Sequence, residues 1–265
     1  MITNSGYNPG YLWLPLIGMG IGILVTMFGG GGGFFYVPVL TLLFRVPTQV
    51  AAATSLAATI PTVVVGSLEH YRKGNVNMQI GSIFGVAGLV GALTGAYLST
   101  LISSALLQKL FGAYAIILTI PMALTSRTRH KNQVSKGTES QSFSGSKMIL
   151  SSFFGLISGI MAGVFGTSGT ASIVAGLYIL GLPVTVVVGT SVLVVLFNAL
   201  SGFIGHVVVG QFDLLLFLLL GSGSLLGAFL GPRLLAKINV QTLEKVYGVI
   251  FILLVIGFGL VMLFK

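Results

Sequence analysis

Long apolar stretches recur along almost the whole chain, and they limit the fold more than any other feature of the sequence. A stretch of about 20 apolar residues is long enough to cross a hydrocarbon core of about 30 Å as an α-helix. Only 6% of the residues are charged, against about 25% in soluble domains, which excludes a soluble fold. A transmembrane barrel would alternate apolar and polar residues in segments of about ten, and the sequence lacks that pattern. We therefore predict an all-α polytopic membrane protein in the lipid bilayer.

Composition also limits the kinds of functional site that the protein can contain. The chain contains no cysteine, which rules out thiol catalysis, disulfides and cysteine-ligated metals. Its net charge of +9 comes mainly from basic residues in short loops beside the spans, where membrane orientation explains them better than nucleic-acid binding does. The N-terminal segment has no basic region before the first apolar run, so we expect no cleaved signal peptide. Without a nucleotide-binding, zinc-protease or catalytic-triad motif, we expect neither an enzyme nor a cofactor.

An internal repeat relates the two halves of the chain. Shifting the sequence by 136 positions aligns identical residues without gaps: Pro47 with Pro183, Thr54-Ser55 with Thr190-Ser191, Gly66 with Gly202 and His70 with His206. Glycines coincide easily in membrane proteins, but proline, threonine-serine and histidine at one common shift do not. We therefore predict two structural repeats, 1–124 and 148–265, joined by a polar basic linker, 125–147.

Each repeat contains the same series of segments: an apolar segment, a break rich in small residues, a short apolar segment and three long spans. These segments lie near 11–28, 34–44, 50–68, 78–101 and 106–124, and near 148–165, 171–180, 186–204, 212–235 and 243–264. The first two segments of each half are too short around the break for two full spans, so we expect a broken-helix hairpin. This gives eight to ten membrane segments.

Charge indicates how the halves lie in the membrane. The linker holds five basic residues and is therefore expected in the cytoplasm. The loop HYRKGNV, with Arg72 and Lys73, falls on the same side, whereas its repeat counterpart HVVVGQF has lost both charges and falls outside. The halves thus look inverted relative to each other, an arrangement typical of secondary transporters that bind substrate near the midplane.

The two breaks supply groups suited to an anion. No acidic residue is expected in the middle of a span, which argues against a carboxylate-based cation site. Anions are held instead by backbone amides, helix N-termini and hydroxyl groups, and glycine permits close backbone approach and positive φ. Helix packing is the alternative role of such glycines. The candidate substrate-binding residues at the breaks are Gly30, Gly31, Gly32, Gly33, Gly166, Thr167, Ser168 and Gly169.

Polar residues within the spans add further candidates. Thr54, Ser55, Thr190 and Ser191 follow the breaks at matching positions; they either contact the ligand or bond to a carbonyl of their own helix. Asn198, in the middle of a span, either donates to substrate or joins helices.

The two repeat-related histidines lie next to glycine-containing turns. His70 and His206 are either surface or capping residues or, together with Arg72, part of a gate or a proton-coupling device. Arg72 also has a simpler role in setting topology.

The first half contains GGGGGFFYVPVLTLLFRVPTQVAAATSLAATIPTVVVGSLEHYRKGNV, and the second contains GVFGTSGTASIVAGLYILGLPVTVVVGTSVLVVLFNALSGFIGHVVVGQFD. These stretches resemble the TauE/SafE family of membrane transporters over nearly the whole chain. The resemblance implies export or exchange of small sulfur-containing anions such as sulfite, sulfoacetate or related sulfonates. One departure is the second break, which reads FGTSG rather than a plain glycine run.

We therefore expect a prokaryotic-type inner-membrane secondary transporter that holds a small sulfur-containing anion between the two breaks and works by alternating access. A channel and a non-transporting membrane scaffold are the alternatives. Substrate, direction, coupling ion and oligomeric state are left open, and a homodimer is among the assemblies that fit.

Overall fold

The computed structural model describes residues 9–28, 32–126, 145–235 and 253–264, and within these ranges the chain forms helices and turns without a strand. The predicted all-α membrane fold is confirmed, because five of these helices are long and apolar enough to cross a membrane. They are α3 (Thr48–Arg72), α4 (Met78–Thr100), α6 (Gly145–Phe165), α8 (Val184–Val208) and α9 (Leu214–Leu235). The other helices are η1 (Pro9–Trp13), α1 (Leu14–Phe28), α2 (Gly33–Pro38), η2 (Val39–Leu43), α5 (Ser104–Ser126), α7 (Thr170–Ile179) and Leu253–Phe264.

Helices α5 and α6 both extend into the predicted linker. α5 continues to Ser126 and α6 begins at Gly145, so the polar segment between them is shorter at each end than the expected 125–147. The interior of that segment lies outside the described residues.

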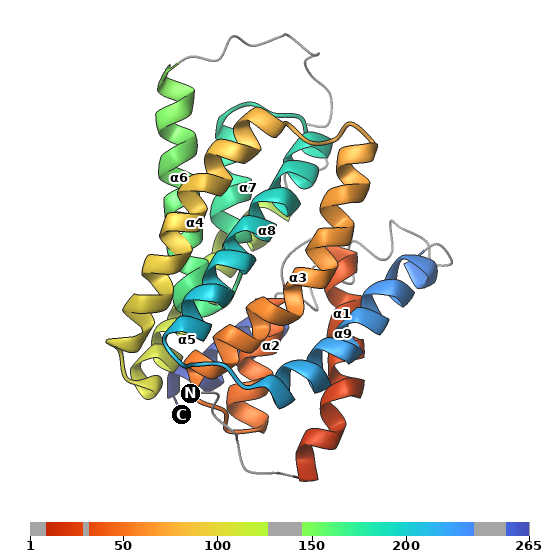
Figure 1. Ribbon diagram of the computed structural model, residues 1–265, viewed down its shortest axis with the longest axis vertical. Helices are drawn as coiled ribbons and strands as arrows, with labels where there is room; N and C mark the ends of the chain where they lie inside the picture. The colour runs from red at the N-terminus through yellow and green to blue at the C-terminus, as the bar shows by residue number, and fades with distance from the viewer. Residues whose placement is uncertain (1–8, 29–31, 127–144, 236–252, 265) are drawn as a thin grey trace.

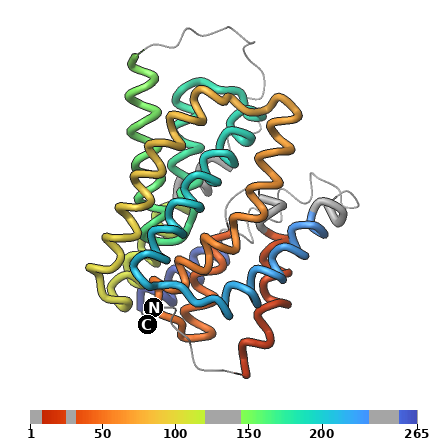
Figure 2. Tube along the Cα trace, in the orientation of Figure 1, coloured from red at the N-terminus to blue at the C-terminus, as the bar shows by residue number. Residues whose placement is uncertain are grey.

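Helices from the two halves pair crosswise. α4 of the first half packs along α6 of the second, and α9 of the second half packs along α1 of the first (Figures 1 and 2). Between these pairs lie α3 and α8, which occupy matching places in the two halves. They run in opposite directions, because Gly66 of α3 lies against Val192 while Gly202 of α8 lies against Leu56. Each half therefore completes its packing with helices of the other half.

Glycine allows the paired helices to touch backbone to backbone. A Cβ atom placed on Gly95 of α4 would lie 2.5 Å from the carbonyl oxygen of Ile160 in α6. Gly91 makes the same kind of contact with Leu156, and Gly227 of α9 makes it with Met19 of α1. These three glycines therefore serve helix packing, the use to which membrane proteins commonly put small residues.

The matching helices α4 and α9 begin with the same type of cap. Asn77 Oδ1 accepts a hydrogen bond from the amide of Ile80 at 3.0 Å, and Asp213 Oδ1 accepts from Leu216 at 3.2 Å. Both side chains satisfy amides that have no partner within the first turn of a helix. The shift of 136 positions therefore relates residues with the same structural role.

The same shift fails at the breaks, which corrects the sequence alignment. The N-cap of α2 is Gly32 and that of α7 is Gly169, so here the halves differ by 137 positions rather than 136. The additional residue is accommodated by η2, a π-helix that has no counterpart after α7, because a π-turn holds one residue more than an α-turn.

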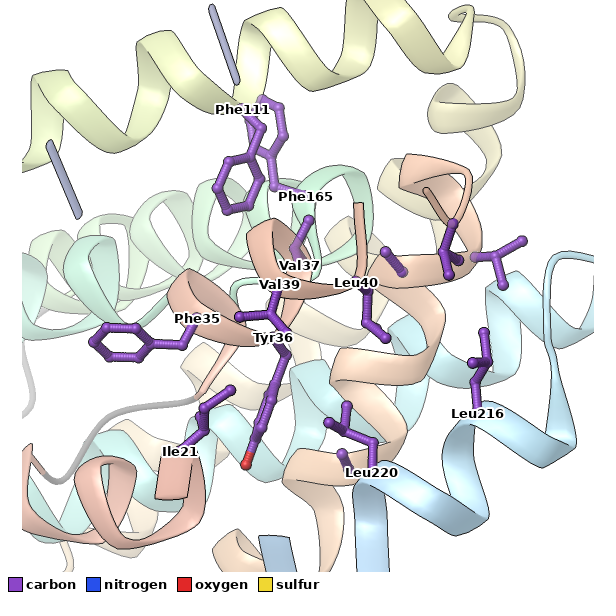
Figure 3. Packing of buried hydrophobic residues seen from close by; sticks show 14 of the residues in the cluster. Ile21, Phe35, Tyr36, Val37, Val39, Leu40, Phe111, Phe165, Leu216 and Leu220 are labelled. Atoms are coloured by element: carbon purple, nitrogen blue, oxygen red, sulfur yellow. The ribbon is translucent and has the colours of Figure 1, made fainter. Parts of the chain in front are cut away.

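An apolar core surrounds α2. Phe111 of α5 and Phe165, the last residue of α6, lie side by side above α2, while Tyr36 extends from α2 toward Leu220 of α9 (Figure 3). Phe111 and Phe165 make an edge-to-face contact with centroids 6.0 Å apart, a favourable ring geometry. This core fixes the short helix of the first half against the break of the second.

Candidate functional site

The second break is a tight reversal between α6 and α7. α6 ends at Phe165, and the next residues include three with positive φ: Gly166 (70°), Ser168 (60°) and Gly169 (71°). Glycine adopts this conformation without a steric cost, as the sequence predicted for Gly166 and Gly169. Because Gly169 lies against Ser158 and Gly176 against Phe154, α7 returns along α6, and the predicted hairpin is present in the second half.

The start of α2 touches this second break. A Cβ atom on Gly33 would fall onto the carbonyl oxygen of Gly166 and the Cα atom of Thr167. Gly166 in turn lies against α3, with the Cα atom of Ala52 at 2.5 Å from a Cβ placed on it. Gly33 and Gly166 thus bring α2, the second break and α3 into contact. Gly32 is the N-cap of α2, whereas Gly30 and Gly31 lie outside the described residues.

Of the two threonine-serine pairs, only Ser55 reaches the break. Its hydroxyl donates to the carbonyl oxygen of Gly166 at 2.8 Å. The Thr54 hydroxyl donates to Val50 of its own helix at 2.8 Å, and that of Ser191 donates to Val188 at 2.8 Å, the intrahelical alternative considered from the sequence.

Thr190, the remaining residue of the two threonine-serine pairs, has a different structural role. Thr190 Oγ1 accepts a hydrogen bond from the backbone amide of Asn77 at 2.9 Å, so it ties α8 to the start of α4. All four hydroxyl residues are buried.

Asn198 joins three parts of the second half. Its Nδ2 atom donates to Ser158 Oγ of α6 at 3.1 Å and to the carbonyl oxygen of Ser168 at 3.2 Å. The bond to a carbonyl identifies this atom as the amide nitrogen, since a carbonyl oxygen only accepts. Asn198 therefore acts as a link between α8, α6 and the break, one of the two roles considered from the sequence.

Three polar atoms near the break are buried without a hydrogen-bond partner: Thr167 Oγ1, Asn198 Oδ1 and the hydroxyl of Tyr114. The hydroxyls of Tyr114 and Thr167 are close neighbours, but they do not form a hydrogen bond. Buried polar groups nearly always have a partner, which makes the hydroxyls of Thr167 and Tyr114 candidate ligand contacts, whereas Asn198 Oδ1 lies against Gly88 of α4.

Tyr114 is the residue that the sequence did not identify. It lies in the middle of α5 and stacks on Phe165 with centroids 4.8 Å apart. One signal in the sequence was available: tyrosines of membrane helices are most frequent at the two interfaces, and Tyr114 is far from either end of its helix.

The two histidines differ in their surroundings. His206 is fully buried, with Nε2 2.8 Å from the carbonyl oxygen of Gly163 and Nδ1 2.9 Å from Gln211 Oε1. The surface alternative is therefore wrong for His206. His70 is half-buried and its Nδ1 has no partner, while Arg72 is exposed at the end of α3. A gating or proton-coupling role for these residues stays a prediction.

The groups named around the second break are neutral hydrogen-bonding groups. Hydroxyls come from Tyr114 and Thr167, and the first amides of α7 have no partner within the helix. The Ser55 hydroxyl proton is already used in the bond to Gly166. Across the described part of the chain, no cluster of three or more His, Cys, Asp or Glu residues is placed to hold a metal ion. Hydroxyls and helix N-termini are groups that bind anions.

The chain matches a known protein family and several bacterial membrane proteins. The family model described as "Sulfite exporter TauE/SafE" matches residues 14–258. The chain is 33% identical over 218 residues to "Probable membrane transporter protein YdhB" of Bacillus subtilis, covering 80% of this chain and 85% of that protein. It is 28% identical over 263 residues to "Probable membrane transporter protein YunE" of the same organism, covering 92% and 95%. No solved structure matches the chain.

Proposed function

Since this chain belongs to the TauE/SafE family, as a multi-pass membrane transporter of prokaryotic type, we propose that it moves a small sulfur-containing anion across the cytoplasmic membrane. Sulfite, sulfoacetate and related organosulfonates are the substrates considered. The anion binds near the middle of the bundle, where the first hairpin meets the second break, and crosses by alternating access.

The observation that carries this proposal is the buried, unpartnered hydroxyl of Thr167, where α2 meets the second break. A hydroxyl without a partner in the protein is available to a ligand oxygen, and a hydrogen bond to a charged group contributes about 1.5–3 kcal/mol. The neutral surroundings suit a small anion because they bind it without a permanent ion pair, which favours release.

The arrangement of the helices supports movement of two blocks about this point. α3 and α8 are antiparallel, and the pairs α4–α6 and α1–α9 form corresponding units on either side of them (Figure 1). Inverted repeats of this kind work by rocking one unit against the other around a central site. The backbone contacts between paired helices make each unit rigid enough to move as one body.

Transport by purified protein in liposomes tests the proposal. We expect saturable uptake of sulfite or sulfoacetate that is accelerated when unlabelled anion is trapped inside. Ionic current that rises linearly with concentration would support a channel instead, and the absence of any flux from folded protein would support a scaffold.

A matched pair of variants tests the site. Thr167→Val keeps the shape of the side chain but removes the hydroxyl, and we expect kcat/KM to fall about tenfold, as the loss of one hydrogen bond to a charged ligand predicts. Thr94→Val is the control, because the exposed Thr94 hydroxyl donates only to its own helix, at Val90 and Gly91. Equal transport by both variants would contradict the site.

A further inference from the structure

A pocket with polar and apolar lining lies away from the breaks, just after η2. It has a volume of about 420 Å³ and lies between the end of η2 and the start of α5. Its lining residues are Thr41, Leu42, Arg45, Val46, Pro47 and the α5 residues Ser104 and Gln108. None of these residues is acidic, and Arg45 supplies a full positive charge.

Arg45 has a backbone conformation that is unusual for its residue type. Its φ is 55°, and Gly181, the corresponding residue two positions before the proline cap of α8, has a φ of 79°. An L-residue in this left-handed region is destabilised by about 1–2 kcal/mol, whereas glycine is not. Arginine thus stands where glycine would be more stable, and residues held in such conformations concentrate at functional sites.

The side chains around the pocket leave donors available. Arg45 is exposed, and among the described residues it makes no ion pair; the salt bridge found there joins Lys73 to Glu69. Gln108 uses one amide proton in a 3.4 Å contact with the carbonyl oxygen of Met262 and retains a second. A guanidinium beside an amide presents several N–H groups to one ligand, and the planar guanidinium binds two oxygens of a sulfonate, sulfite or phosphate at once.

One continuous helical segment spans the distance between the proposed binding site and the pocket. α2 and η2 run from Gly33, which touches the second break, to Leu43, beside the pocket. Eleven residues at about 1.5 Å rise place the two ends roughly 15 Å apart. Arg45 lies just before the first residue of α3, and Arg72 is its last residue. The pocket therefore lies at the end of α3 away from the loop predicted to be cytoplasmic.

We infer that this pocket is a docking site for an oxyanion at the outer mouth of the protein, where Arg45 and Gln108 capture the sulfur-containing anion before it reaches the breaks. This inference rests on the proposed function for the identity of the anion. A charged group at the entrance of a narrow site raises the local concentration of its counterion and the rate of association.

The test compares Arg45→Gly with wild type in liposomes, using sulfite and sulfoacetate added on the side that Arg45 faces. Loss of a charge-assisted contact predicts an increase in KM of about five- to tenfold with kcat unchanged, together with weaker dependence of KM on salt. The variant is expected to fold at least as well as wild type, because glycine suits the backbone at this position. Lys109→Gln is the control: it removes a neighbouring exposed charge on α5 that does not line the pocket, and KM should stay within twofold.

Three results would overturn the inference. The first is an unchanged KM and salt dependence in Arg45→Gly while wild type transports normally; loss of transport in wild type would instead refute the proposed function. The second is an equal effect of Lys109→Gln, which would reduce the role of Arg45 to general surface charge. The third is an effect of Arg45→Gly confined to liposomes that contain phosphatidylglycerol and absent in pure phosphatidylcholine, which would assign the pocket to a lipid phosphate.

Discussion

Alanine at Gly159 tests whether the pairing of α4 with α6 depends on the absence of a side chain. A Cβ atom at this position falls against the carbonyl oxygen of Gly88 and lies 2.8 Å from the amide nitrogen of Ala92. Non-bonded carbon and oxygen atoms approach each other to about 3.3–3.6 Å even in close helix contacts. To make room, the two helices must separate by roughly 1 Å, which also loosens the neighbouring glycine contacts.

The size of the effect follows from these distances. Introducing one methyl group into a packed interface costs about 1–3 kcal/mol. A gap of about 0.5–1 Å between α4 and α6 also removes about a quarter to a half of the dispersion energy of each atom contact along their interface. For a chain of this size, about 2 kcal/mol corresponds to a decrease of roughly 4–8 °C in the melting temperature. We expect Gly159→Ala to show this decrease when the loss of monodisperse protein in detergent is followed against temperature.

Gly20→Ala is the matched control. Gly20 lies in α1, and a Cβ atom placed on it meets no other group within 4 Å. Alanine favours a helix over glycine by up to about 1 kcal/mol, so the melting temperature should stay unchanged or rise. If both variants melt at the same temperature, the argument from backbone contact between α4 and α6 is refuted.

Two further predictions concern polar links between helices. Asp213→Ala removes the acceptor for two amides at the start of α9 and should lower the free energy of unfolding by about 1 kcal/mol. Asp213→Asn should keep the stability of the wild type, because Asn77 fills the same role in α4. Equal melting temperatures for the two variants would contradict the capping role of Asp213. Asn198→Ala removes two hydrogen bonds, each contributing about 0.6 kcal/mol inside a membrane, so we expect a loss of about 1 kcal/mol in the same melting assay. Unchanged melting together with lost transport would instead identify Asn198 as a substrate contact.

Features that depend on local sequence were predicted well. The ends of α1 and α6 at Phe28 and Phe165 agree with the predicted segments, because apolar length and glycine are both local signals. Gly166 and Gly169 have the positive φ that their residue type suggested. Confirmed membership of the family agrees with the motifs on which the resemblance rested.

Features that depend on contacts between distant segments were not predictable. Thr54 and Ser55 are adjacent in sequence, yet one hydroxyl stays within its helix and the other reaches Gly166, 111 positions away. Which hydroxyl points outward depends on how α3 rotates against α6, and the residue types do not encode that rotation. The π-helix after Pro38 was not predicted for a similar reason. An additional residue in one turn changes the alignment of the two halves without changing the apolar pattern of the sequence.

The crosswise pairing of helices has a consequence for how the chain is assembled during synthesis. Gly18 of α1 packs against Leu220 of α9, so the first membrane helix meets its partner only after about 200 further residues have been made. At about 5–20 residues per second, this interval lasts roughly 10–40 s. Throughout it, the glycine-lined face of α1 has only lipid, the membrane insertion machinery or its own hairpin to contact. The first half is therefore inserted into the membrane well before its packing can be completed.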